Sequence, residues 1–424
     1  MQISANKPII MPQPAAPARR APAPTSIFTS APAEDRVSLN PSPGQAAPAA
    51  DGPNKGPGPG GYPKAKWTVL NYCAADNNLY AYIYDDAASM EKIGSTGSVQ
   101  LVTQFDHQGN GAYRFRVEKD AETGPEAERH IDSPVLQSLG PVNMSDPKTL
   151  SDFISWGIKT FPAEHYMLVI ADHGKGWEGL IQDDSHKGWM SVPQLRQALE
   201  TAQKETGQKL DVLGFDACQM AAVEVASEIK DYARFMVASQ ALEGREGWPY
   251  SHILGQGQLA DIHQAHLFKS DVEARQVVEL VVQSAAENQN VLPTMAGFDL
   301  SKMADLEKSL KKFSVELTAS GLSGSLMRQL RSKTQTFGFV YDLGDFLKRT
   351  AASAATQNQL NLKKVADECL EQLNQVIIAE HHNEQNPGAT GLSVELKQTK
   401  APYDQLAFVG ATDWKQTVDR FNQA

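Results

Sequence analysis

Short apolar segments that alternate with helical patterns are the feature that most constrains the fold of this chain. Four of them are typical of buried strands: "WTVLNY" (67–72), "VQLVTQFD" (99–106), "YMLVIAD" (166–172) and "LDVLGFD" (210–216). Further expected elements are a hairpin strand at 112–117, a strand at 234–239 and helices near 76–93, 144–161, 191–206 and 218–230, with Asp76 and Ser145 as the caps of the first two helices. Strands separated by helices predict an α/β fold with a mainly parallel sheet flanked by helices.

The composition divides the chain into three parts. Fourteen of the 24 prolines fall in residues 1–63, among Ala, Ser and Gly, so this segment buries too little apolar surface to fold and is expected to be disordered. Residues 64–260 carry the strand and helix alternation and form the expected catalytic domain. Residues 261–424 are helix-rich and are expected to complete the fold, with strand-like segments at 294–300, 390–396 and 405–409.

Charge and cysteine content exclude several classes of protein. The net charge of −11 and pI near 5.4 argue against a nucleic-acid partner, which needs a basic face. No apolar run reaches the roughly 18–20 residues of a membrane span, and the N-terminus lacks the apolar core of a secretory signal. Three distant cysteines do not form a disulfide framework. A cytoplasmic location without membrane attachment is therefore the expectation.

Two apolar strands end in residues that carry chemistry. "YMLVIAD" runs into His173, and "LDVLGFD" runs into Cys218. Because the carboxyl ends of parallel strands meet at one sheet edge, a thiol and an imidazole come together there, as nucleophile and acid/base. Cys218 is expected to open a helix, whose dipole lowers the pKa of a thiol. Gly174, after the histidine, lets its N–H approach a substrate carbonyl and form an oxyanion hole with the N–H of Cys218. The alternative is ordinary: a small core cysteine and a hydrogen-bonded histidine.

Several motifs in the same order resemble the clostripain family of cysteine endopeptidases, which share the caspase-like fold. The resemblance covers most of 66–424 and rests on "WTVLNYCAADNNL" (67–79), "PAEHYMLVIADHGKGW" (162–177), "LGFDACQMAAVEVA" (213–226), "EGWPY" (246–250), "YDLGDF" (341–346), "NPGATGLSVEL" (386–396) and "YDQLAFVGATDWKQTVDRF" (403–421). It implies a caspase-like α/β fold in which His173 and Cys218 match the catalytic pair. It also implies protein or peptide substrates that are cleaved after Arg or Lys.

A basic substrate side chain needs a carboxylate in its pocket, because an unpaired buried charge is costly. Asp216 matches an acidic pocket position of the family, although a strand-end Asp that caps the next helix is an equal alternative. Glu243 and Glu246 are further substrate-binding candidates. Relatives typically carry acidic residues directly after Ala-Ser, where this chain has Gln240-Ala241, so the preference between Arg and Lys stays open.

The resemblance suggests self-cleavage and an ion. Some relatives mature by cutting themselves between the histidine and the cysteine, and Lys187, in the polar loop 182–191, is the candidate here; a solvated loop lysine is the alternative. Some relatives require Ca²⁺, for which Asp183 and Asp184 supply too few of the six to eight oxygens. His381-His382, expected on a helix, point apart and have no third ligand, so no metal is assigned.

Two other classes of function compete with the peptidase. A catalytically silent binding scaffold of the same fold is disfavoured because His173, Gly174 and Cys218 are all present. A nucleotide-binding α/β protein requires a glycine-rich turn after an early strand. The turn after the first strand, "CAADNN", has no glycine, and "GKGWEG" (174–179) lacks the required spacing.

Overall fold

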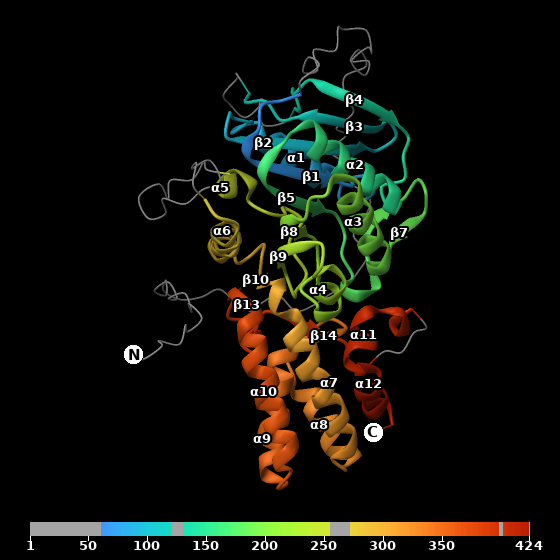
Figure 1. Cartoon of the computed structure of the whole chain (residues 1–424), viewed down its shortest axis with the longest axis vertical. Coiled ribbons are helices and arrows are strands. Elements are labelled where there is room, and N and C mark those ends of the chain that lie inside the picture. Colours follow the sequence, from blue (N-terminus) through green and yellow to red (C-terminus); the bar gives the residue numbers. More distant parts are fainter. Residues whose placement is uncertain (1–60, 121–129, 255–271, 398–401, 424) are drawn as a thin grey trace, which may run out of the picture.

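The computed structural model describes residues 61–120, 130–254, 272–397 and 402–423 (Figure 1). Within these ranges one large sheet has the strand order β13-β10-β9-β8-β5-β1-β2-β3-β4. Its strands are β1 (Ala65–Cys73), β2 (Val99–His107), β3 (Gly111–Arg116), β4 (Val135–Gly140), β5 (Ala163–Ala171), β8 (Leu210–Asp216), β9 (Ala233–Ala238), β10 (Thr294–Asp299) and β13 (Ile377–His382). The predicted segment 1–63 lies almost entirely outside the described residues.

The centre of the sheet is parallel and its edges are antiparallel. Strands β9, β8, β5, β1 and β2 all run in the same direction. At one edge β3 pairs antiparallel with β2 and β4 pairs antiparallel with β3, and at the other edge β10 pairs antiparallel with β9 and β13 with β10. This arrangement confirms the predicted α/β fold with a mainly parallel sheet. Smaller pairings join β6 (Leu180–Asp183) to β7 (Gly188–Met190), and β11 (Thr336–Phe337), β12 (Val340–Asp342) and β14 (Ser393–Val394) to one another.

Helices cover both faces of the sheet. They are α1 (Tyr80–Met90), α2 (Pro147–Thr160), α3 (Val192–Thr206), α4 (Val223–Ile229), α5 (Tyr250–Leu254), α6 (Ala274–Glu287), α7 (Met303–Ala319), α8 (Gly324–Lys333), α9 (Leu343–Thr356), α10 (Leu360–Val376), α11 (Ala407–Thr412) and α12 (Trp414–Asn422). Because side chains alternate along a strand, β1 serves two cores. Leu70 and Tyr72 pack with α2 and α3, whereas Val69 and Cys73 pack with α1 and α6. No helix of the described residues has both the length and the apolarity of a membrane span.

The second half of the chain extends the sheet and adds a helical layer. Strands β10 and β13 continue the sheet beyond β9, and α10 packs on α7 and α9. Helices α7, α8, α9 and α10 project together beyond the β13 end of the sheet (Figure 1). The expected boundary between residues 260 and 261 lies outside the described residues, so the division into two domains stays a prediction.

Local signals fix some helix boundaries. Ser191 caps α3 in a reciprocal capping box with Gln194, and the helix ends at Gly207 in the left-handed region. Helix α2 is capped by Asp146, whose side chain accepts the N–H of Lys148, so Ser145 was the wrong cap by one residue. Helix α1 begins only at Tyr80, so the predicted cap Asp76 is wrong.

Some predicted elements differ in the structure. Segment 405–409, expected as a strand, lies mostly in helix α11, since a short apolar run does not distinguish a buried strand from a buried helix. Segment 390–396 contributes only the two-residue strand β14. His381 and His382 lie on strand β13 and not on a helix. The sequence prediction also missed β4, whose side chains are mostly exposed and lack apolar alternation, and the hairpin β6–β7.

Candidate active site

The edge where β5 and β8 end brings the two predicted catalytic segments together. Ala171 and Asp216, the last residues of these strands, are partners in the parallel register. Beyond them the two chains stay in contact, since the N–H of Asp172 donates to the carbonyl of Asp216 at 3.2 Å. His173-Gly174 and Cys218 therefore leave the sheet at the same edge.

Gly174 shows how closely the two segments approach each other. A Cβ atom at this position would lie 2.2 Å from the carbonyl oxygen of Cys218, far inside van der Waals contact. Only glycine fits at this position, for a reason that the sequence did not indicate: the main chain of the cysteine segment occupies the space that a side chain would need. The N–H groups of Gly174 and Cys218 donate to no main-chain carbonyl of the described residues.

Asp172 holds the histidine loop in place through hydrogen bonds. Its carboxylate is buried and accepts hydrogen bonds from Asn77 Nδ2 at 2.7 Å and from the N–H of Gln182 at 2.6 Å. Asn77 Nδ2 also contacts the carbonyls of Ala74 and Gln182. These bonds tie the turn after β1, the histidine loop and strand β6 into one unit, so the position of His173 is set by three segments.

His173 is half-buried and has a side-chain partner. Its Nε2 atom lies 2.8 Å from Asn78 Oδ1, and its ring lies 6.2 Å from the ring of Trp189. If the oxygen of Asn78 accepts, Nε2 carries the proton and Nδ1 is left as the basic nitrogen. Burial, followed by the charge of Lys175, lowers the pKa of His173 below its ordinary value. The imidazole is therefore neutral at neutral pH and able to accept a proton.

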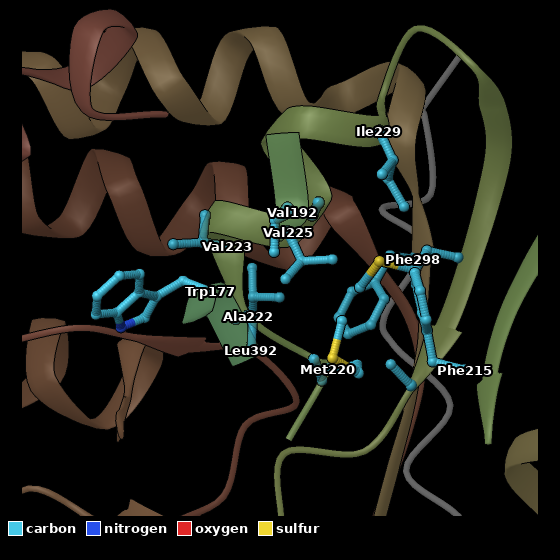
Figure 2. Packing of buried hydrophobic residues seen from close by; sticks show 14 of the residues in the cluster. Trp177, Val192, Phe215, Met220, Ala222, Val223, Val225, Ile229, Phe298 and Leu392 are labelled. Carbon is cyan, nitrogen blue, oxygen red and sulfur yellow. The ribbon is translucent and has the colours of Figure 1, made fainter. Parts of the chain in front are cut away.

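Cys218 is a partly buried free thiol that lies against Glu243. Its Sγ receives the main-chain N–H of Glu243 at 3.4 Å. Helix α4 begins only at Val223, so the prediction that Cys218 opens a helix is wrong, and with it the dipole argument. Burial, followed by the charge of Glu243, raises the pKa of Cys218 to about 11, the opposite of the expected direction. Residues 220–223 after the cysteine run into the core; Figure 2 shows Met220, Ala222 and Val223 there.

Three carboxyl groups cluster beside the cysteine, and we name Asp86, Asp216 and Glu243 the acidic pocket. A Cβ atom at Gly247, whose φ is +58°, would lie 2.9 Å from Asp86 Oδ2 and 3.0 Å from Asp216 Oδ2, so both carboxylates face the same glycine. Asp216 accepts the hydroxyl of Tyr250 at 2.8 Å. Because Ala222 and not Asp216 precedes α4 as its cap residue, the capping alternative for Asp216 is wrong.

The pocket gathers three carboxyl groups, none of which forms an ion pair with a cation of the described residues. Both carboxylate oxygens of Glu243 are buried and accept no hydrogen bond of normal geometry from the described residues, while Asp216 and the equally unpaired indole N–H of Trp248 lie close enough to shift its pKa. Burial raises the pKa values of Asp86, Asp216 and Glu243, and the neighbouring charge of Asp216 adds to the effect on the other two. The sequence analysis missed Asp86, because no local pattern in α1 predicts that this residue lies near the end of a strand far along the chain. A buried carboxylate with no donor is costly unless it is protonated or gains a partner.

Glu246 and Lys187 lie at the surface. Glu246 is exposed, and its charge contributes to the raised pKa of Asp86, which places it at the rim of the pocket. Lys187 is exposed in the turn of hairpin β6–β7, where its φ is +53°. The next residue, Gly188, is paired with Asp183, so the peptide bond after Lys187 belongs to an ordered hairpin and not to the open loop that was expected.

The two aspartates considered for calcium, Asp183 and Asp184, separate in the structure. The ligand oxygens of Asp76, Asp106 and Asp183 lie within 4.8 Å of one another, and we name these three residues the acidic trio. Asp184 is exposed and outside it. Asp183 already accepts the N–H groups of Met144 and His186. With one ligand oxygen from each residue the trio offers three of the six to eight oxygens that Ca²⁺ takes, so it does not form a complete calcium shell, and no step of the reaction is derived through the ion.

The chain is similar to known proteins over most of its length. The sequence profile described as the clostripain family matches residues 71–420. The clostripain of Hathewaya histolytica is 22% identical over 404 residues, which cover 80% of this chain and 76% of that protein. Several solved structures share the fold, which agrees with the expected caspase-like class.

Two of these structures illustrate the likeness. A secreted C11 cysteine protease from Bacteroides thetaiotaomicron, solved with an irreversible peptide inhibitor, has a TM-score of 0.61 and 19% identity, covering 82% of this chain and 99% of its own. An inactive zymogen C11 protease from Parabacteroides distasonis has a TM-score of 0.61 and 20% identity, with the same coverage of 82% and 99%.

Proposed function

The chain belongs to the clostripain family of cysteine peptidases, and from this membership we propose that it is an endopeptidase that cleaves after Arg or Lys with Cys218 as nucleophile and His173 as acid/base. The observation that carries the proposal is the acidic pocket beside the thiol. Glu243 contacts Sγ through its main-chain N–H, while its carboxylate is buried without a hydrogen-bond donor. A guanidinium or ammonium group supplies the missing donors and the missing positive charge.

The reaction follows from the neutral forms of both groups. His173 accepts the Sγ proton of Cys218 through Nδ1, and the thiolate attacks the carbonyl carbon of the basic residue. The N–H groups of Gly174 and Cys218 donate to the oxyanion of the tetrahedral intermediate. His173 then protonates the leaving amine, and a thioester remains on Cys218. Water, deprotonated by His173, hydrolyses the thioester and frees the thiol.

A panel of peptide reporters with Arg, Lys, citrulline or Gln before the scissile bond tests this proposal. We expect the Arg and Lys reporters to be cleaved much faster than the citrulline and Gln reporters, and all cleavage to be lost in Cys218→Ala and in His173→Ala. Cys369→Ala is the matched control, because Cys369 is a buried free cysteine on α10 and its removal leaves the dyad untouched. Unchanged cleavage in Cys218→Ala would exclude the dyad, and absence of cleavage by the wild type would favour the silent scaffold.

Self-cleavage at Lys187 is a second part of the proposal. The lysine is exposed at a turn, but Gly188 is packed so closely that a Cβ there would lie 2.0 Å from Ser145 Oγ. The hairpin must therefore open locally before the bond can enter an active site, so slow processing is expected. N-terminal sequencing of the purified protein should reveal a chain that starts at Gly188. Lys187→Gln should remove this chain, and Cys218→Ala should remove it too. An active protein without that N-terminus would contradict self-cleavage here.

A further inference from the structure

Glu243 links the acidic pocket to the sulfur through a single residue. Its N–H donates to Cys218 Sγ at 3.4 Å, and its carbonyl oxygen lies 4.0 Å from the same atom. Its carboxylate lies in the pocket with both oxygens buried and without a donor. A change of charge in the pocket therefore alters the electrostatic potential at the thiol, because the distance is short and little solvent lies between them.

The charged groups around Cys218 oppose the formation of a thiolate in the free enzyme. Burial raises the pKa of the thiol most, and the charges of Glu243 and Asp216 raise it further. Asp86 stands behind Asp216, and Glu246 lies further out at the rim. On the other side the imidazole of His173 has a lowered pKa, because of burial and Lys175. Without a substrate the pair therefore consists of a neutral thiol and a neutral imidazole.

We propose that a cationic side chain bound in the acidic pocket activates Cys218 as well as being recognised there: its charge offsets those of Glu243 and Asp216 and promotes transfer of the Sγ proton to His173. This inference rests on the proposed function of the pocket. In the step the S–H bond breaks, an N–H bond forms on the imidazole, and no other reactant is needed. Glu243 is accordingly a residue that couples substrate recognition to the reactivity of the nucleophile. Peptides with a neutral side chain at this position meet a thiol that is largely protonated.

The size of the effect follows from the charges involved. One unit charge introduced within about 8 Å of the sulfur, at the effective dielectric constant of about 20 of protein sites, changes the pKa of the thiol by roughly one unit. The thiolate fraction at pH 7.5 then rises on the order of tenfold, and so does the rate of any reaction of the thiolate with a neutral electrophile.

Alkylation by iodoacetamide with and without a pocket ligand tests the coupling. In this reaction the thiolate displaces iodide and a C–S bond forms. n-Butylguanidine carries the cation without a scissile bond, and n-butylurea has nearly the same shape without the charge. We expect saturating n-butylguanidine to accelerate alkylation of Cys218 about tenfold and n-butylurea to leave it unchanged. Thiolate absorbance at 240 nm, corrected with Cys218→Ala, reports the same change without access of a reagent to the sulfur.

Variants then locate the effect. Glu243→Gln should raise the rate without ligand several-fold and reduce the stimulation by n-butylguanidine. Glu200→Gln on α3 is the control for the loss of one negative charge; Glu200 lies in an exposed pair with Lys204, far along the chain from the pocket. Neither the basal rate nor the stimulation should change in this variant.

Two failures are distinguishable. If n-butylguanidine inhibits cleavage of the Arg reporter competitively but leaves both the alkylation rate and the 240 nm absorbance unchanged, the coupling is wrong and the pocket assignment stands. If n-butylguanidine does not compete at all, the assignment of the pocket to basic side chains is wrong, and the coupling falls with it.

Discussion

Two groups of three carboxylates lie in the same α/β layer, and they differ in what satisfies their oxygens. In the acidic trio, Asp183 accepts the main-chain N–H groups of Met144 and His186, and Asp76 accepts that of Ser185 at 3.1 Å. In the acidic pocket, the carboxylate of Glu243 accepts no hydrogen bond from the described residues. Main-chain donors of the protein thus hold Asp76 and Asp183 in the trio, whereas no such donor among the described residues reaches the carboxylate of Glu243 in the pocket.

The comparison shows that the number of acidic residues does not identify a binding site. Both groups contain carboxyl groups with raised pKa values, as burial and neighbouring charge require. The difference is the place of the unpaired group: Glu243 contacts the sulfur of Cys218, while the trio is tied to the turn after β1 and the hairpin β6–β7. Exchange of a single carboxylate in each group should therefore affect different properties of the enzyme.

The largest expected effect comes from the pocket. Asp216→Asn should lower kcat/KM for an Arg reporter on the order of 100-fold or more, because a cation is then bound next to a weaker acceptor. Asn keeps the size of the side chain and can still accept the hydroxyl of Tyr250, so the fold is retained. The ratio of kcat/KM between Arg and citrulline reporters is the measurement. Asp106→Asn, in the trio, is the matched control, and its ratio should equal that of the wild type. An equal loss for both reporters in Asp216→Asn would show that Asp216 supports the fold and not the recognition of charge.

A pH effect of intermediate size should separate basic from neutral substrates. The carboxyl groups of the pocket have raised pKa values, so they become protonated at a higher pH than ordinary carboxyl groups as the pH falls, and a cationic side chain then loses its partners. The KM of the Arg reporter should rise about tenfold per pH unit along this limb, while a slowly cleaved citrulline reporter follows only the protonation of His173 at lower pH.

Glu243→Gln sharpens this prediction. In this variant the only ionisable carboxyl groups of the pocket are Asp86 and Asp216. Because fewer negative charges repel one another, these two groups ionise more easily, so the acid limb of the Arg reporter should move to lower pH. Steady-state profiles of kcat/KM for both reporters between pH 4 and 8 measure the shift. Identical limbs for the Arg and citrulline reporters would contradict an ionisable pocket.

The sequence predicted the parts of this molecule that have a local pattern. Apolar strands gave the parallel centre of the sheet, and the ends of β5 and β8 indicated His173 and Cys218. The start of α4 was predicted too early, because buried residues at 220–223 continue the apolar pattern before the helix begins. The roles of both residues stay predictions until their variants are assayed.

Features that depend on contacts between distant segments could not be predicted from the sequence. Gln240, which looked like a lost acidic residue, is buried and donates to Asp342 at 2.9 Å and to Ser393 at 3.0 Å, so it joins two of the family motifs. The acidic pocket combines α1, the end of β8 and the loop after β9, which no spacing rule connects. The raised pKa of Cys218 follows from the same tertiary contacts, which is why an argument from the helix dipole gave the wrong sign.

The smallest expected effect concerns the trio and is one of stability. Burial, followed by the charge of Asp183, raises the pKa of Asp106 to about 7, and no described residue donates a hydrogen bond to its carboxylate. A carboxyl group whose pKa is higher in the folded than in the unfolded state destabilises the fold as the pH rises from about 4 to about 7. Above this pH range the loss of stability does not increase further. Asp106→Asn lacks the ionisation, so it should be more stable than the wild type at pH 8 by about 1–2 kcal/mol and nearly equal to it at pH 4.

Unfolding by urea at the two pH values, with a metal chelator present, measures this difference. The chelator matters because a bound cation would stabilise the ionised trio and hide the effect. Asp184→Asn is the control, since Asp184 is exposed beside the trio and its loss should shift stability similarly at both pH values. A variant Asp106→Asn that is less stable than the wild type at pH 8 would mean that the ionised carboxylate has a partner in solution. Asp106 would then resemble Asp76 and Asp183, which accept main-chain N–H groups, and the contrast between the trio and Glu243 of the pocket would be sharper.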